Sequence, residues 1–209
     1  MDWNNPLRSI ARTVDPDVLK VLAGAHLPLT GRRVSVLAGR SYAQVHAVLA
    51  RLAADGLVTV ERHGQANSFL LNRDHLVVPG LLAVLGAGNR LTDVIGAEAA
   101  SWVLPAVTIC LFGSASRGEA LPSSDVDLLV VRPDTVDQDN RHWRDAVAAL
   151  AQRVELVTGN RTQVVELSES EIQMAAAQGQ PLTDSLRAGA RTVFGLDVRL
   201  LLAQDGSGS

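Results

Sequence analysis

The sequence has few of the residues on which several protein classes depend. Its one cysteine, Cys110, excludes a disulfide framework and a cysteine-rich zinc site. Aromatic residues make up 3% of the chain, which argues against a surface that stacks bases or sugars. No apolar run reaches the roughly 18 residues that a membrane helix needs, and no N-terminal stretch is typical of a signal peptide. We therefore expect a cytoplasmic protein with no membrane partner.

The residues that are present indicate folded domains. The chain has 209 residues, of which 47% are hydrophobic and 20% charged, and this length favours two modest domains. The formal net charge of −3 conceals an uneven distribution. Residues 1–75 carry nine Lys and Arg against six Asp and Glu, a balance of +3, whereas residues 76–209 carry a balance of −6. Such asymmetry suggests two modules with different partners.

The basic first module contains three helical segments followed by two strands. We expect helices over residues 15–24, 31–38 and 42–55, with N-caps at Asp15, Thr30 and Ser41. Strand-like runs over 57–62 and 67–72 flank a turn at His63, Gly64 and Gln65. This order resembles the winged helix-turn-helix regulators of the ArsR/MarR kind.

The resemblance implies that the first module binds double-stranded DNA. The third helix would enter the major groove by its N-terminal end, and the wing would reach the minor groove. The residues implied are Ser41, Tyr42 and Gln44 for bases or phosphates, Arg51, Arg32 and Arg33 for the DNA backbone, and Arg62 and His63 for the minor groove. In the alternative interpretation, the module serves protein contact or dimerisation.

The rest of the chain has an α/β pattern. Residues 76–103 are expected to form one or two helices, broken near Gly86, that pack the modules together or form a homodimer. Strands are expected over 106–113, 126–131 and 162–167, and helices over 140–157, from Ser168 with a capping box to Glu171, and over 181–192. The domain boundaries predicted are 1–75, a helical linker over 76–105, a second domain over 106–203 and a flexible tail over 204–209. Cys110 is expected in the core of the second domain.

The segment 111–131 carries the chemistry. A strand runs into Gly113 and Ser114, where glycine lets the backbone approach a ligand and free N–H groups at a helix start favour phosphate. After ten intervening residues, Asp125 and Asp127 lie two apart on a strand, so their carboxylates share one face. Two carboxylates beside a phosphate cradle are what a magnesium-bound nucleoside triphosphate requires.

Gly113-Ser114-x-x-Arg117-Gly118 with Ser124-Asp125-x-Asp127 resembles the nucleotidyltransferase superfamily of the polymerase-beta type. The minimal nucleotidyltransferases are the most similar members, and kanamycin nucleotidyltransferase is a more distant one. The resemblance implies two Mg²⁺ ions and an NTP, with ATP expected, and transfer of a nucleoside monophosphate to a hydroxyl. The whole chain is then α+β: an N-terminal winged helix-turn-helix plus a C-terminal α/β nucleotidyltransferase fold with a short mixed sheet.

The resemblance also assigns roles to single residues. Asp125 and Asp127 would hold the metals and carry catalysis, Gly113, Ser114 and Arg117 would bind the triphosphate, and Ser124 would support the turn. The family usually has a third carboxylate where this chain has Gln163, and Glu166 could supply it only through a shifted register or a bulge. Two functions stay open: transfer to an acceptor such as a partner toxin, or a DNA-binding regulator whose second domain senses nucleotide.

Overall fold

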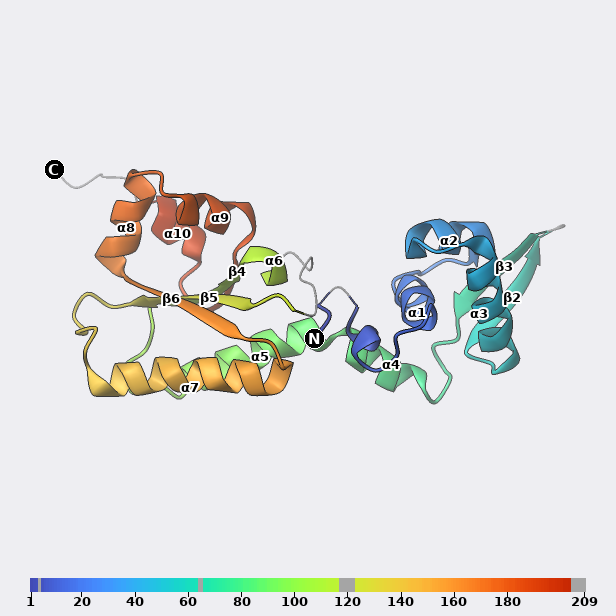
Figure 1. Ribbon diagram of the computed structural model, residues 1–209, viewed down its shortest axis with the longest axis horizontal. Helices are drawn as coiled ribbons and strands as arrows, with labels where there is room; N and C mark the ends of the chain where they lie inside the picture. The colour runs from blue at the N-terminus through green and yellow to red at the C-terminus, as the bar shows by residue number, and fades with distance from the viewer. Residues whose placement is uncertain (4, 64–65, 117–122, 204–209) are drawn as a thin grey trace. The chain divides into compact units, whose positions relative to one another are not determined.

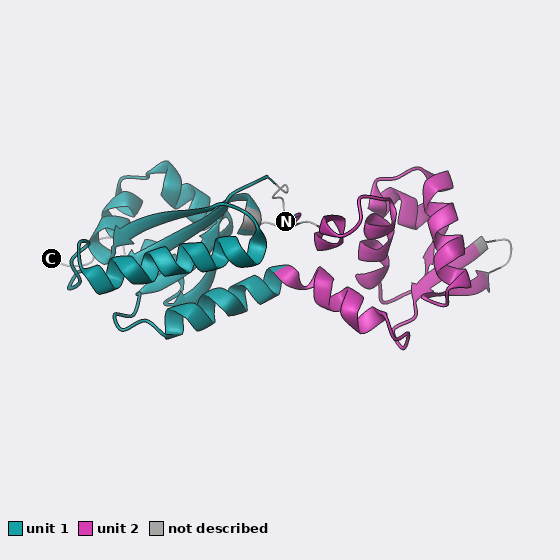
Figure 2. Cartoon of the chain, turned by 60° about the horizontal axis from the view of Figure 1, so that its bottom comes forward, with its two compact units in different colours: residues 1, 3, 88–209 teal, residues 2, 4–87 magenta. Residues whose placement is uncertain are grey.

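The computed structural model describes residues 1–3, 5–63, 66–116 and 123–203, and the chain divides into two compact units. Unit 1 contains Met1, Trp3 and Gly88–Ser209, and unit 2 contains Asp2 and Asn4–Ala87 (Figure 2). The segment 76–105, expected as a separate linker, is divided between them. Helix α4 (Val78–Leu85) belongs to unit 2, and α5 (Ala87–Ala100) begins at the boundary.

Unit 2 contains the three helices and the two-stranded hairpin that the sequence predicts, together with a short 3-10 helix and a third strand that it does not. A short 3-10 helix, η1 (Pro6–Ser9), precedes α1 (Asp15–Ala23), β1 (Leu29–Thr30), α2 (Gly31–Ala38), α3 (Tyr42–Ala54), β2 (Val58–His63) and β3 (Ala66–Leu71). The strands pair antiparallel in the order β1-β3-β2. Apolar residues of α1 to α3, among them Leu22, Val45 and Leu49, are fully buried against the sheet.

The sequence pattern predicted the N-cap residue correctly for α2 and α3 but not for α1. The Thr30 hydroxyl accepts the backbone N–H of Arg33 at 3.3 Å, and Ser41 caps α3 in the same way, as predicted. Asp15 was the wrong cap for α1, because Val14 takes the cap position and Asp15 is the first helical residue. There its carboxylate still lies in the first turn, where the helix dipole favours negative charge. The predicted turn residues Gly64 and Gln65 lie outside the described residues.

Unit 1 is built on the short mixed sheet that was expected. Its strands are β4 (Thr108–Phe112), β5 (Val126–Arg132), β6 (Thr162–Ser168) and β7 (Arg191–Gly195), in the order β6-β5-β4-β7. Only β5 and β6 pair in parallel, and α7 (Arg141–Thr158) connects them. The remaining helices are α6 (Gly113–Ser116), α8 (Glu169–Ala177), α9 (Pro181–Gly189) and α10 (Val198–Ala203).

Helices cover both faces of this sheet (Figure 1). Helices α5 and α7 bury one face, where Trp143, Leu150 and Val154 pack against alternate residues of β4 and β5. Helices α8, α9 and α10 bury the other face, which includes Cys110 and Leu129. Cys110 is fully buried, as expected, and burial raises the pKa of its thiol to about 12.

Two expectations for unit 1 need correction. Val157 was predicted to face inward from α7, but it is 41% exposed, and the next residue, Thr158, is buried instead. The helix predicted to reach residue 192 ends at Gly189, and the chain then forms edge strand β7 and helix α10.

Among the described residues, no helix has the length and apolar character needed to cross a membrane.

Candidate nucleotide site and nucleic-acid surface

Gly113 joins β4 to the single turn of α6, and its backbone lies against Asp127. Its φ of +71° is in the left-handed region that favours glycine. A Cβ at this position would collide with the Asp127 carboxylate. Register explains the contact, because Phe112, which precedes Gly113, pairs with Asp127 across β4 and β5. The glycine of the motif is therefore needed for the carboxylate to keep its position.

The rest of the motif lies on both sides of this contact. Ser114 is half-buried in α6, and the Ser116 hydroxyl closes the turn by donating to the Gly113 carbonyl at 2.9 Å. Ser124 precedes Asp125, and its carbonyl accepts a hydrogen bond of 2.9 Å from the Asn160 side chain. Asn160 thereby ties the turn after α7 to the aspartate segment. Arg117 lies outside the described residues.

Asp125, Asp127 and Gln163 come together at one end of the sheet. Gln163 pairs with Asp127 in the parallel ladder of β5 and β6, and its Nε2 donates to Asp125 Oδ2 at 2.6 Å. Burial, and secondly the negative charge of Asp125, raise the pKa of Asp127 above its usual value. Within the described ranges, no group of three or more His, Cys, Asp or Glu residues could hold a metal ion. The available oxygen ligands are two carboxylates and one amide, which are donor types that Mg²⁺ accepts.

Glu166 does not join this group. The pairing of β5 with β6 runs in one unbroken register from Val126 to Arg132, so no bulge brings Glu166 to the aspartates. Glu166 lies on the opposite face of β6 from Gln163. Its Oε1 accepts from Arg132 Nε at 3.1 Å and from Trp143 Nε1 at 2.9 Å. The expectation that Glu166 could replace the third carboxylate is corrected by these contacts, which no pattern in the sequence had indicated.

A Glu166→Gln variant is expected to lose stability. The Arg132 side chain is only 10% exposed, and removing its partner's charge should cost about 1–3 kcal/mol of unfolding free energy. The measurement is urea unfolding followed by tryptophan fluorescence. An unfolding free energy equal to that of wild type would show that the pair of Glu166 with Arg132 does not stabilise unit 1.

An Asp127→Asn variant is expected to be the more stable protein at neutral pH without metal. The folded pKa of Asp127 is raised, so the folded state binds more protons than the unfolded state, and stability falls as pH rises from 3.8 through the folded pKa. The amide removes this cost, and we expect a Tm higher by up to about 2 °C at pH 7 and equal values below pH 3.8. Differential scanning fluorimetry in EDTA tests this, with exposed Asp139→Asn as the control. A lower Tm at pH 7 for Asp127→Asn alone would contradict it.

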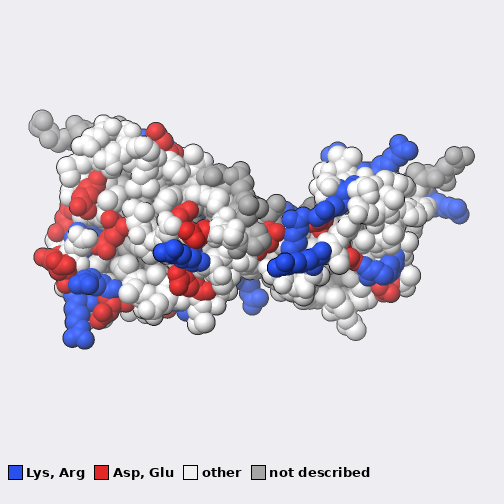
Figure 3. All heavy atoms as spheres, viewed as in Figure 1, with Lys and Arg blue, Asp and Glu red and all other residues white. Residues whose placement is uncertain are grey.

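The residues of α2, α3 and β2 up to Arg62 that were predicted to contact DNA are exposed on unit 2, but their surroundings differ. Arg32, Arg33 and Arg62 are exposed and form no ion pair with any described residue. Arg51 forms ion pairs with Asp15 and with Asp55, the latter at 3.9 Å, so its charge is largely compensated within the unit. Lys and Arg side chains gather on the face of unit 2 seen in Figure 3.

The N-terminal end of α3 presents a polar edge. The Ser41 hydroxyl donates to Gln44 Oε1 at 2.9 Å, so these two predicted base contacts are engaged with each other. Tyr42 is half exposed, and its ring lies 5.7 Å from that of His46, a residue that the sequence had not singled out. His63 ends β2, at the wing. Arg32, Tyr42 and His46 line one hollow with Asn67 of β3, so the start of α2 lies beside the first turns of α3.

Comparison with known proteins identifies the segment that contains the aspartates. The family model of the nucleotidyltransferase domain matches residues 97–175. The matched segment runs from the last turn of α5 into α8, and it includes Gly113, Asp125, Asp127 and Gln163. No curated protein sequence matches the chain.

The solved structures that are similar to the chain include the following three. One is a toxin–antitoxin with AMP-PNP, at 21% identity and a TM-score of 0.38, over 54% of this chain and 82% of that one. Another is a mutant of the toxin–antitoxin MntA-HpeT, at 20% identity and a TM-score of 0.35, over 56% and 82%. The third is TrmBL2, an archaeal chromatin protein, at 13% identity and a TM-score of 0.28, over 84% and 72%.

Proposed function

We propose that the chain is a magnesium-dependent nucleotidyltransferase that carries a DNA-binding unit. It transfers a nucleoside monophosphate from an NTP to a hydroxyl, and pyrophosphate leaves. The observation that carries the proposal is the close approach of the Gly113 backbone to Asp127, with Asp125 beside it, inside the segment that matches the nucleotidyltransferase domain. The glycine turn can bind the triphosphate, and the two carboxylates can bind the metal ion that accompanies it.

Each residue of the motif has a role in this proposal. Asp125 and Asp127 hold Mg²⁺; burial, and secondly the negative charge of Asp125, raise the pKa of Asp127, and a bound cation would offset both effects. Bound Mg²⁺ would activate the acceptor oxygen and neutralise charge on the departing pyrophosphate. Gly113 and Ser114 orient the triphosphate, and Arg117 adds a phosphate contact. Ser124 supports the turn before β5.

A transfer assay tests this function directly. The intact chain is incubated with each of the four labelled NTPs, a cell lysate as acceptor source, and either Mg²⁺ or EDTA. Label that becomes covalently attached to a macromolecule only with Mg²⁺ supports the enzyme. The resemblance in sequence makes a partner protein such as a toxin the first acceptor to examine in the labelled fraction. Absence of label with every NTP, in a protein that still binds them with Mg²⁺, would refute it.

A specific contact favours a second candidate, a DNA-binding regulator that senses nucleotide. Gln163 donates to Asp125, and an amide can neither act as a general base nor add a third negative charge for a second metal ion. Such a site would bind Mg²⁺ and NTP but would transfer the nucleoside monophosphate slowly or not at all. Tight binding of Mg-NTP by calorimetry without label transfer identifies the regulator.

The proposal for unit 2 is a winged helix-turn-helix that binds double-stranded DNA. The observations behind it are the order α1-α2-α3 followed by the β2–β3 hairpin, and the exposed Arg32, Arg33 and Arg62, which form no ion pair with a described residue. A charge balance of +3 over residues 1–75 is small, so affinity should depend on dimerisation and on specific contacts.

An Arg32→Ala, Arg33→Ala variant should lose at least about tenfold in DNA affinity and show a smaller salt dependence. A gel shift with the DNA upstream of the gene, at two salt concentrations, measures both. Arg153→Ala, an exposed arginine of α7, is the control. An unchanged specific shift would remove the start of α2 from the DNA surface.

A further inference from the structure

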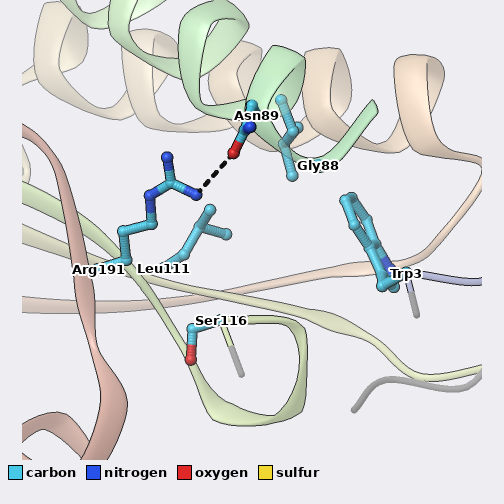
Figure 4. A pocket seen from close by; sticks show the side chains of 7 residues that line it. Trp3, Gly88, Asn89, Leu111, Ser116 and Arg191 are labelled. Atoms are coloured by element: carbon cyan, nitrogen blue, oxygen red, sulfur yellow. Dashed lines mark hydrogen bonds between the residues drawn. The ribbon is translucent and has the colours of Figure 1, made fainter. Parts of the chain in front are cut away.

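Unit 1 has a pocket on the face of its sheet that α5 and α7 cover (Figure 4). Leu111 and Arg191 line it, whereas Phe112, the strand partner of Asp127, packs in the core on the opposite face. The pocket therefore lies apart from the aspartates. Its polar side chains Asn89 and Arg191 are exposed, and Arg191 Nη1 donates to Asn89 Oδ1 at 3.2 Å, so we assign no ligand to it.

Unit 2 contains a buried carboxylate that binds two arginines. Asp17, in the first turn of α1, is 6% exposed. Its Oδ1 accepts from Arg8 Nε at 2.8 Å and lies 2.7 Å from Arg8 Nη2. Its Oδ2 accepts from Arg40 Nε at 2.8 Å and lies 2.8 Å from Arg40 Nη2. The Asn5 side chain adds a further donor to Oδ1 at 3.2 Å. Each oxygen of Asp17 thus contacts two nitrogens of one guanidinium.

The two arginines come from different parts of the unit. Arg8 belongs to η1, whereas Arg40 lies between Gly39, the left-handed C-cap of α2, and Ser41, the N-cap of α3. The backbone N–H of Arg40 also donates to a carbonyl of α2 at 3.1 Å. Charge-assisted hydrogen bonds to a carboxylate are strong and directional, so Asp17 fixes α1 to the turn that joins α2 to α3.

The two arginines depend on Asp17 to different degrees. Arg8 Nη1 also lies 3.5 Å from Asp2 Oδ2, so Arg8 has a second carboxylate within reach. Asp17 is the carboxylate partner of Arg40, and the described residues offer it no other. Loss of the Asp17 charge therefore releases Arg40 and the turn that contains it, whereas Arg8 keeps one partner.

We propose that Asp17 is a positioning residue for DNA binding, which holds the start of α3 in place through Arg40 and contacts no DNA itself. The inference rests on the proposed DNA-binding function of unit 2. Ser41 and Tyr42, two of the proposed DNA contacts, follow Arg40 directly in the chain. A displaced turn would move these side chains away from their bases. General attraction to phosphates depends on charge and would remain.

An Asp17→Asn variant separates positioning from simple electrostatics. It raises the charge balance of residues 1–75 from +3 to +4, which by itself should strengthen binding to any duplex. We expect instead that affinity for the DNA upstream of the gene falls at least about tenfold relative to that for an unrelated duplex of equal length. Fluorescence anisotropy with both duplexes measures this ratio. Equal or tighter specific binding by Asp17→Asn would overturn the inference.

Arg8→Ala and Arg40→Ala form a matched pair that remains informative where Asp17→Asn fails to fold. The two side chains are 37% and 39% exposed, and each variant removes one guanidinium from Asp17. Arg40→Ala alone should lose specific affinity, and its salt dependence should stay that of wild type. A salt slope smaller by about 1 would make Arg40 a phosphate contact, and equal losses in both variants would show a general structural effect; either result contradicts the proposal.

Hydrogen exchange of the intact chain without DNA tests the positioning separately from the proposed function. The N–H of Val45 donates to the Ser41 carbonyl at 3.1 Å in the first turn of α3. Amides of this turn should exchange at least about tenfold faster in Arg40→Ala and at the wild-type rate in Arg8→Ala. Faster exchange in a chain that binds no duplex supports the hold of Asp17 on α3 and refutes DNA binding. Unchanged exchange in Arg40→Ala overturns the inference even where the chain binds DNA.

Discussion

A protein carrying both Asp125→Asn and Asp127→Asn is expected to transfer nucleotide at least about 10³-fold more slowly than wild type. The two carboxylates are the only negative groups near Gly113 and Gln163 that the described residues bring together, so the double variant leaves no charged ligand for Mg²⁺. Asparagine keeps the shape of each side chain, which limits the change to charge. The measurement is the initial rate of label incorporation at saturating Mg²⁺ and NTP.

The matched control is Asp139→Asn, which removes one exposed carboxylate from the same unit. It should retain the wild-type rate. The double variant should also retain a cooperative unfolding transition, because neither aspartate forms an ion pair with a described residue. A folded double variant that still transfers within about tenfold of wild type would show that the metal site lies elsewhere.

Replacing Gly113 by alanine is expected to lower the transfer rate about 10²-fold, because displacement of a catalytic group by about 1 Å has an effect of this size. The new Cβ meets the Asp127 carboxylate and forces it to move. The left-handed backbone at Gly113 adds a separate cost of about 1–2 kcal/mol in stability.

Gly179→Ala separates these two effects. Gly179 has a φ of +62° and no atom within 4 Å of an added Cβ, so its alanine variant has the backbone cost without the collision. Both variants should therefore lose similar stability in urea, and only Gly113→Ala should lose transfer. Equal rates in the two variants would mean that the contact between Gly113 and Asp127 does not matter for the reaction.

Local patterns were enough to predict most of the secondary structure. The caps at Thr30 and Ser41 and the capping box between Ser168 and Glu171 were predicted from residue types at fixed spacing, and each cap uses only neighbours in sequence. Val157 was misplaced because the buried stripe of an 18-residue helix drifts around its axis, and Thr158 took its place. Edge strand β7 depends on its pairing with β4, 80 residues earlier in the chain, which no local pattern encodes.

The part of the candidate site that lies on a single strand could be predicted from the sequence. Asp125 and Asp127 share a face because of strand alternation. The hydrogen bond from Gln163 to Asp125 depends on the parallel register of β5 and β6, which α7 and its turns determine. The role of Glu166 was harder still to predict, because its hydrogen-bond partners Arg132 and Trp143 come from two different elements, β5 and α7. Sequence alone left its role open for that reason.

Complete burial of Cys110 gives the chain its own reporter of unfolding. The thiol is fully inaccessible at the centre of β4, and its pKa of about 12 leaves almost no reactive thiolate at neutral pH. A thiol reagent can therefore label the protein only when the helices α8, α9 and α10 or the sheet of unit 1 open. Because the chain has no other cysteine, the labelling rate reports opening of unit 1 and not of unit 2.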